Sequence, residues 1–178
     1  MTAPVAPPAD PWVDLRRHTP ARIALGRTGT SLPTAEVLRF AAAHAQARDA
    51  VHVPLDGPPL LGALHAHGWT ALQVSSRAAT RDDYLRRPDL GRRLAPRDVD
   101  RVQQLATGSV DLAVVLADGL SAAAAQRHGV PMLRALHAAL DHAALRWAPV
   151  VVATQARVAL ADEIGALLNA RVALILIG

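Results

Sequence analysis

The sequence predicts an α/β fold, in which a Rossmann-like parallel sheet is flanked by helices and carries a helical N-terminal elaboration. In the second half of the chain, short apolar runs alternate with segments of helical periodicity, and this alternation is typical of βαβ units. The chain is 178 residues long and 51% hydrophobic, so it can bury a sizeable core. It has no cysteine and only three Trp, one Tyr and one Phe, so that core must be aliphatic.

The N-terminal part of the chain is predicted to be an arm followed by helices. Residues 1–9 are rich in Pro and Ala, which predicts a flexible arm. Asp10 and Pro11 are typical of a helix start, and Pro20 would end that helix. Further along we expect a short strand, a turn, a helix and a break, at Ala21–Leu25, Gly26–Thr30, Thr34–Arg48 and Pro54–Pro59.

The rest of the chain is predicted to alternate between strands and helices. Strands are expected at Ala71–Ser75, Asp111–Leu116, Val150–Thr154 and Arg171–Ile177. Helices are expected at Leu60–His67, Pro96–Ala106, Pro131–Trp147 and Ala161–Leu168. Thr80 and Asp83 have the spacing of a capping box. We therefore divide the chain into an arm (1–9), an N-terminal helical segment (10–58) and a Rossmann-like α/β domain (59–178).

Two loops are predicted to form a binding edge of the sheet. Ligands of parallel sheets bind beyond the carboxyl ends of the strands, which places Ala117–Ser121 and Gln155–Val158 at the same edge. Within the first loop, Asp118, Gly119 and Ser121 are candidate binding residues, because free backbone N–H groups at a helix start can bind polar groups. We expect Ser121 to cap the helix that begins at Ala122 rather than to act as a nucleophile.

The sequence predicts neither catalytic residues nor a metal site. The motifs G-x-G-x-x-G, G-x-x-x-x-G-K-[ST] and G-x-S-x-G are absent, and the lack of cysteine removes thiol and thiolate chemistry. His65 and His67 are two residues apart, so on a helix they point in different directions, unlike the i, i+4 pair of a zinc site.

The basic residues leave a nucleic-acid-binding domain as the alternative function. All 19 Lys and Arg positions are arginine, and the formal net charge is +4. The arginines are densest between Arg77 and Arg101, where aspartates partly neutralise them, and Gly26–Gly29 has the G-x-x-G form of an RNA-clamping loop without its usual flanks. No apolar run reaches the roughly 18 residues of a membrane-spanning helix, and the N-terminus lacks the basic start of a signal peptide.

Four blocks of sequence, in a fixed order, carry a family resemblance. They are ARIALGRTGTSLP (21–33), YLRRPDLGRRL (84–94), DLAVVLADGLS (111–121) and RVALADEIGALLNARVALILIG (157–178). These blocks resemble the small (light) subunit of ethanolamine ammonia-lyase, an adenosylcobalamin-dependent carbon–nitrogen lyase. They span nearly the whole chain after Asp10.

The resemblance implies a hetero-oligomer with the ethanolamine ammonia-lyase large subunit. In this family the large subunit is a TIM barrel that carries the catalytic residues, and the complex converts ethanolamine to acetaldehyde and ammonia. The small subunit covers the cobalamin from the other side, so we expect neither a nucleic acid nor a membrane as partner. Relatives that enter bacterial microcompartments tend to have a longer N-terminal extension, so we expect a cytoplasmic location, with the microcompartment as the alternative.

The resemblance also adds two residues to the cofactor-binding set. Val158 matches a cobalamin-contacting position of the family, and the adjacent Arg157 is placed to reach a corrin amide or the phosphate of the nucleotide tail. The family usually has glycine where this chain has Ala156. A glutamate and a later cysteine that contact the cofactor in relatives would follow Gly178, so we expect the chain to be truncated at its C-terminus and the α/β domain to be incomplete.

Overall fold

The computed structural model describes residues 10–178, and the chain divides into two compact units, Met1–Arg48 and Asp49–Gly178. The predicted arm, residues 1–9, lies outside the described residues. The expected division at residues 58 and 59 stays a prediction.

The first unit contains a short 3-10 helix, η1 (Val13–Arg17), and most of helix α1 (Thr34–His52). The helix start predicted at Asp10 and Pro11 is two residues early: η1 begins at Val13 after the N-cap Trp12, which has no side-chain cap bond, and Asp10 Oδ1 accepts a hydrogen bond from the Trp12 N–H at 2.9 Å in the preceding turn. The strand predicted at Ala21–Leu25 is wrong: no strand forms there, and Ala24 has a φ of +52°, which an extended strand does not allow.

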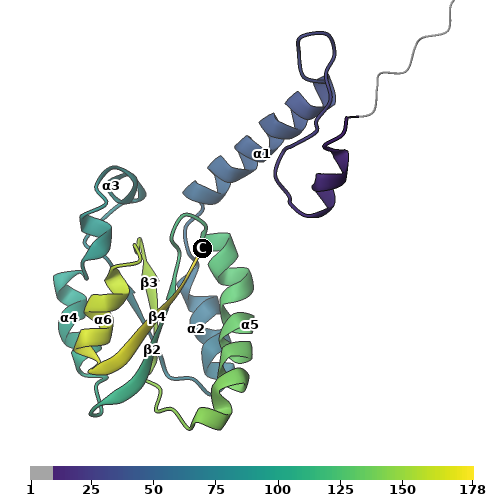
Figure 1. Ribbon diagram of the computed structural model, residues 1–178. Helices are drawn as coiled ribbons and strands as arrows, with labels where there is room; N and C mark the ends of the chain where they lie inside the picture. Colours follow the sequence, from purple (N-terminus) through teal and green to yellow (C-terminus); the bar gives the residue numbers. More distant parts are fainter. Residues whose placement is uncertain (1–9) are drawn as a thin grey trace, which may run out of the picture. The chain divides into compact units, whose positions relative to one another are not determined.

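The second unit is built on a four-stranded parallel sheet (Figure 1). Its strands are β1 (Ala71–Ser75), β2 (Val110–Ala117), β3 (Val150–Thr154) and β4 (Ala170–Ile177). They lie in the order β1-β3-β2-β4, and every neighbouring pair is parallel. All four strands match the predicted ones to within one residue at each end, and the predicted fold class is confirmed.

Helices cover both faces of the sheet and form two aliphatic cores (Figure 1). The helices of this unit are α2 (Gly57–Ala66), α3 (Arg81–Arg86), α4 (Pro96–Gln103), α5 (Ala122–Leu140) and α6 (Leu160–Leu167), with 3-10 turns η2 (Leu90–Arg92) and η3 (Asp141–Ala143). Helices α2 and α5 pack on one face, and α4 and α6 pack on the other. Buried valines and alanines of the strands lie between these layers, as the small number of aromatic residues requires.

Two predicted helices differ from the structure, and in both cases the difference concerns proline. The helix start expected at Ala122 is confirmed, but the helix predicted at Pro131–Trp147 is not a separate element, because one helix, α5, runs from Ala122 to Leu140 and contains Pro131 in its interior. Here the alanine-rich first turns and the Ser121 cap outweigh the hydrogen bond that proline removes. The break predicted at Pro54–Pro59 ends early, because α2 begins at Gly57 and takes its two prolines in the first turn, where no N–H is needed.

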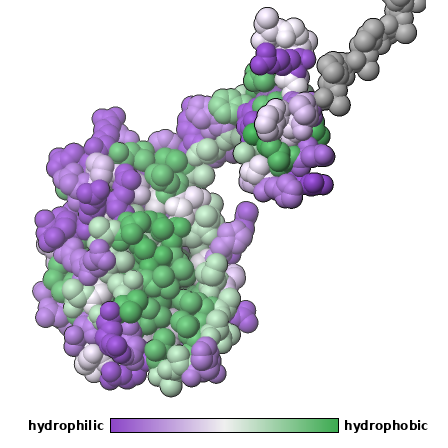
Figure 2. All heavy atoms as spheres, viewed as in Figure 1, coloured by the Kyte–Doolittle hydropathy of each residue, from purple (hydrophilic) through white to green (hydrophobic). Residues whose placement is uncertain are grey.

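Strand β4 lies at one edge of the sheet and has an apolar surface. Val172 is 56% exposed and Ile177 is 39% exposed, and Figure 2 shows hydrophobic residues gathered over the part of the unit where β4 lies. An apolar groove of about 340 Å³ runs between β4 and the first half of α5. Among the described residues, no helix has the length and apolarity needed to cross a membrane.

Candidate functional site

The two predicted loops meet at the carboxyl edge of the sheet, where the Asp118 side chain joins them. Asp118 directly follows β2, and its Oδ2 accepts a hydrogen bond from the Gln155 N–H at 2.7 Å. Its Oδ1 accepts a second bond from the Ala156 N–H at 3.0 Å. Because Gln155 and Ala156 directly follow β3, one carboxylate fixes the relative position of the two loops.

The Asp118 side chain is buried, and both of its carboxylate oxygens already have partners within the protein. The residue is 4% exposed, and the Arg81 guanidinium lies 3.6 Å from its Oδ2. Burial raises the pKa of the Asp118 carboxyl, while the hydrogen bonds from Gln155 and Ala156 and the charge of Arg81 oppose that shift. Both carboxylate oxygens are already bonded inside the protein, so Asp118 positions the edge and has little capacity to bind a ligand directly.

This carboxylate occupies the place where an open α/β sheet usually holds its ligand. The chain leaves β2 through α5 on one face and leaves β3 through α6 on the other, so the crevice between these neighbouring strands is a topological switch point. Asp118 fills the crevice from within. A ligand of this edge must therefore lie on top of the 155–158 loop or beside it.

Gly119 lies where only glycine fits. Its φ is +51°, and a Cβ added to it would lie 2.3 Å from the Gly178 carbonyl oxygen. Its own carbonyl accepts a hydrogen bond from Arg81 Nη2 at 2.9 Å, and the Leu120 N–H donates to the Gly178 oxygen at 2.9 Å. Gly119 thus allows the end of β2 and the end of β4 to approach closely.

Ser121 caps helix α5, as the sequence predicts. Its Oγ accepts a hydrogen bond from the Ala124 N–H at 3.2 Å. A hydroxyl that accepts this bond satisfies one of the free N–H groups of the first helical turn. Asp118, Gly119 and Ser121 are therefore brought together, and each has a contact that shapes the loop.

Arg157 stacks on a buried tyrosine that the sequence analysis did not single out. Its guanidinium carbon lies 4.3 Å from the centre of the Tyr84 ring, and that of Arg81 lies 4.5 Å from the same ring. Arg157 Nη2 donates to the Tyr84 carbonyl at 2.9 Å, while Arg157 Nε is buried without a hydrogen-bond partner among the described residues. The Tyr84 hydroxyl donates to the Ala156 carbonyl at 3.2 Å, and burial raises its pKa. Tyr84 therefore supports the 155–158 loop from below.

Val158 stands apart from these buried contacts. Val158 is 62% exposed, whereas Ala156 before it and Leu160 after it are completely buried. Gln155, at the start of the same loop, has a φ of +58°, a left-handed conformation that is uncommon for a residue with a side chain. The structure thus places an apolar side chain in solvent on a loop that several hydrogen bonds hold in place.

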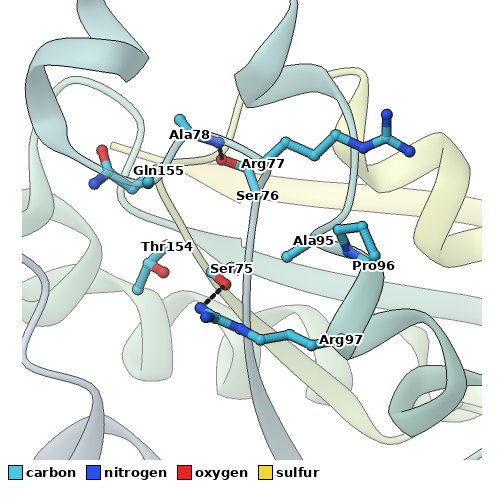
Figure 3. Close-up of a pocket in the computed structure, with 10 residues that line it drawn as sticks. Ser75, Ser76, Arg77, Ala78, Ala95, Pro96, Arg97, Thr154 and Gln155 are labelled. Atoms are coloured by element: carbon cyan, nitrogen blue, oxygen red, sulfur yellow. Dashed lines mark hydrogen bonds between the residues drawn. The ribbon is translucent and has the colours of Figure 1, made fainter.

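Beside this loop, the edge contains a cleft of about 730 Å³ at the carboxyl ends of β1 and β3 (Figure 3). It is lined by Ser75, Ser76, Arg77, Ala78, Ala79, Ala95, Pro96, Arg97, Thr154 and Gln155. The predicted binding edge did not include this cleft, although the end of β1 also lies at the carboxyl edge of the sheet. The segment Ser75–Ser76–Arg77 comes at the end of a predicted strand and therefore belongs to the same edge.

The histidines do not gather with acidic residues. Within residues 10–178, no group of three or more His, Asp or Glu side chains lies close enough together to hold a metal ion. The side chains at the edge can position, stack and donate hydrogen bonds.

Fold and edge together define an α/β domain with an all-parallel sheet in the order β1-β3-β2-β4, whose carboxyl edge holds two loops joined by Asp118. A model of the family described as ethanolamine ammonia-lyase light chain (EutC) matches residues 9–178. The chain therefore belongs to the ethanolamine ammonia-lyase light chain family.

Curated relatives agree with this assignment. The ethanolamine ammonia-lyase small subunit of Pseudomonas syringae pv. tomato is 53% identical over 176 residues, which is 97% of this chain and 61% of the relative. That of Xanthomonas campestris pv. campestris is 50% identical over 181 residues, 100% of this chain and 66% of the relative. That of Pseudomonas aeruginosa PAO1 is 52% identical over 178 residues, 98% of this chain and 65% of the relative. The chain thus spans 61–66% of the length of these relatives.

Proposed function

We propose that this chain acts as the small subunit of an adenosylcobalamin-dependent ethanolamine ammonia-lyase. In this proposal it forms a hetero-oligomer with the large subunit, and the complex converts ethanolamine to acetaldehyde and ammonia. The observation that carries the proposal is the 50–53% identity, over nearly the whole chain, to relatives named as this subunit. The catalytic residues are expected on the large subunit, for which the family resemblance implies a TIM barrel.

The residues of the carboxyl edge fit a large, partly apolar cofactor with amide side chains. Val158 offers an exposed apolar contact, and Arg157 has a buried Nε without a partner among the described residues. When bound, adenosylcobalamin supplies the radical chemistry through cleavage of its cobalt–carbon bond. Val158 would pack against the cofactor and exclude water, and Arg157 would donate hydrogen bonds to an amide or a phosphate oxygen.

The other residues of the edge would act by holding this surface in shape. Asp118 ties the loop after β3 to the loop after β2, and Gly119 allows β4 to come close. Tyr84 stacks beneath Arg157 and bonds to Ala156, so the loop loses little conformational freedom when it meets its partner. We propose Asp118, Gly119 and Ser121 as positioning residues, and Val158 and Arg157 as the residues that touch the cofactor.

The alternative, a nucleic-acid-binding domain, has less support. Arginines 81, 86, 87, 93 and 101 of the basic segment each lie within 4.0 Å of an acidic oxygen. Paired guanidinium groups contribute less to the release of counterions from a nucleic acid. The cytoplasmic location stays a prediction.

Co-purification tests the proposed function. The chain is co-expressed with an ethanolamine ammonia-lyase large subunit from the same source and passed through size exclusion with adenosylcobalamin present. We expect co-elution of both chains with a cobalamin absorbance. If the chains elute separately both as given and after extension beyond Gly178 to the length of the relatives, the proposed subunit role is wrong.

A further inference from the structure

We propose that the cleft at the carboxyl ends of β1 and β3 is a binding site for a phosphate ester. The cleft has a volume of about 730 Å³ and lies beside the loop that carries Val158 (Figure 3). Ligand sites typically measure about 300–1,000 Å³, so the cleft is large enough for a phosphorylated sugar. Its position at the carboxyl end of the strands is the position at which parallel sheets bind ligands.

Two arginines make the cleft electropositive. Arg77 and Arg97 are the charged residues among those that line it, and both are exposed. Arg77 Nε donates to the Leu94 carbonyl at 3.3 Å, and within residues 10–178 Arg77 has no acidic oxygen within 4.0 Å. Its guanidinium therefore has donors left for the oxygens of an anion.

Arg97 is held in place by groups that do not neutralise it fully. Its Nη2 donates to Ser75 Oγ at 2.8 Å, the contact drawn in Figure 3. The nearest acid is Asp98, whose Oδ2 lies 3.9 Å from Arg97 Nε and also accepts bonds from the Ser75 N–H and hydroxyl. The other oxygen of Asp98 pairs with Arg101, so one carboxylate is shared between two arginines. The planar guanidinium of Arg97 matches the geometry of phosphate oxygens.

The uncharged lining favours an ester over inorganic phosphate. Ser76 Oγ accepts a bond from the Ala78 N–H at 3.2 Å, which leaves the hydroxyl proton free to donate. Thr154 Oγ1 also lines the cleft and donates to the Val74 carbonyl at 3.3 Å, which leaves its oxygen free to accept a hydrogen bond. A sugar hydroxyl can donate to this oxygen, and a phosphate ester of a sugar carries both the anion and the hydroxyl.

The phosphate could come from two sources with the same chemistry. One is a free sugar phosphate. The other is the phosphodiester in the nucleotide tail of cobalamin, and this source rests on the proposed function. The two are separated by cobinamide, which has the corrin ring but lacks the nucleotide tail.

The first arm of the test uses the 178-residue chain alone. Inorganic phosphate and ribose 5-phosphate are titrated by calorimetry into the wild type, Arg77→Gln, Arg97→Gln and Thr154→Val, with ribose as the uncharged ligand. Arg127→Gln, at an exposed position of α5 outside the cleft, removes the same charge and is the matched control. Circular dichroism of each variant verifies that it is folded.

We expect saturable binding of ribose 5-phosphate, weaker binding of phosphate and no binding of ribose. Arg77→Gln and Arg97→Gln should each weaken phosphate binding about tenfold, because each removes charge-assisted hydrogen bonds, while Arg127→Gln changes it less than twofold. Thr154→Val removes the accepting hydroxyl at nearly constant size and should abolish the preference for the ester. If the cleft variants bind phosphate as tightly as Arg127→Gln does, or if the wild type shows no saturable binding, the site does not exist.

The second arm uses the complex with the large subunit and identifies the source. Displacement of ribose 5-phosphate by hydroxocobalamin but not by cobinamide supports the nucleotide tail as the natural ligand. Displacement by neither supports a free sugar phosphate. Since the first arm needs neither the large subunit nor a cobalamin, failure of the phosphate site and failure of the proposed function are recognised separately.

Discussion

Val158 is an apolar side chain that stands in solvent on a loop held by buried hydrogen bonds. Because 62% of the residue is exposed, its methyl groups contribute little to the core. A ligand or a partner that covers this loop would bury them. A charge at this position would have to be desolvated on contact with a cofactor.

Val158→Asp is therefore expected to weaken adenosylcobalamin binding by the complex at least tenfold, with little change in thermal stability. The matched control is Val172→Asp, at a position of the same unit that is 56% exposed and lies near the amino end of β4, at the opposite end of the sheet from the carboxyl edge. Affinity is followed by cobalamin absorbance after size exclusion. Equal retention of cobalamin by both variants would remove Val158 from the proposed contact set.

The second residue-scale prediction concerns the pH dependence of stability. Burial raises the pKa of the Asp118 carboxyl above its ordinary value, so the pKa is higher in the folded than in the unfolded chain. A carboxyl of this kind contributes its full stabilisation below the unfolded-state pKa and loses part of it as the pH rises through the folded-state pKa.

Asp118→Ala should lower the free energy of unfolding by about 2–4 kcal/mol, because two backbone N–H groups lose their partner. The difference between the wild type and Asp118→Ala should be larger at about pH 4 than at about pH 7. Urea unfolding at both pH values measures it. A difference that grows with pH would show that the hydrogen bonds outweigh burial.

At the scale of elements, the loop between β2 and α5 depends on one backbone conformation. Gly119→Ala places a Cβ 2.3 Å from the Gly178 oxygen at a φ of +51°, so we expect destabilisation by about 1–3 kcal/mol. Gly62→Ala, in the interior of α2 with nothing within 4 Å of the added Cβ, is the control and should stabilise by about 0.5–1 kcal/mol. Thermal unfolding of the two variants gives the comparison, and equal melting temperatures would contradict the steric argument.

The elements also show what the sequence can and cannot predict. Strands β1 and β3 were predicted to the residue: β3 is a short, buried aliphatic run with clear ends, and β1 is a short run between Gly68 and Ser76 in which apolar and polar residues alternate. The continuity of α5 through Pro131 was not predicted, because Pro131 is typical of a helix start, and the cost of an internal proline is offset by tertiary packing that no local pattern records. The strand expected at Ala21–Leu25 does not form. Its local sequence favours a strand, but no segment of the described first unit pairs with it.

In the candidate site, too, some contacts could be predicted from the sequence and others arise only from the tertiary fold. The meeting of Asp118 with the loop after β3 was predictable in outline, because parallel strands end at one edge. The stacking of Arg157 on Tyr84 was not, since these residues are 73 positions apart and only the fold brings them together. The cleft beside β1 was predictable from the edge rule but has no sequence motif of its own.

At the scale of the whole molecule, the two units differ in how they are stabilised. The sheet unit has two aliphatic cores, whereas none of the residues of η1 and α1 is buried. Helices without a buried face depend on weak local interactions and open readily. In the isolated chain we expect amides of residues 34–48 to exchange with deuterium at least 100-fold faster than those of β2 and β3. Hydrogen exchange resolved by residue measures this, and comparable protection in the two units would contradict it.

The Asp118 carboxylate occupies its crevice as a bound anion would, except that it is covalently attached to the chain. It sits on two backbone N–H groups and near an arginine, an arrangement that in other proteins receives an anion from solution, but covalent attachment gives it a very high effective concentration. In Asp118→Ala that anion is missing, and a small carboxylate such as formate can replace it. The melting temperature of Asp118→Ala should therefore rise with formate concentration, while that of the wild type stays constant at matched ionic strength. The crevice of this fold would then behave as a receptor whose own occupant can be exchanged for a soluble one.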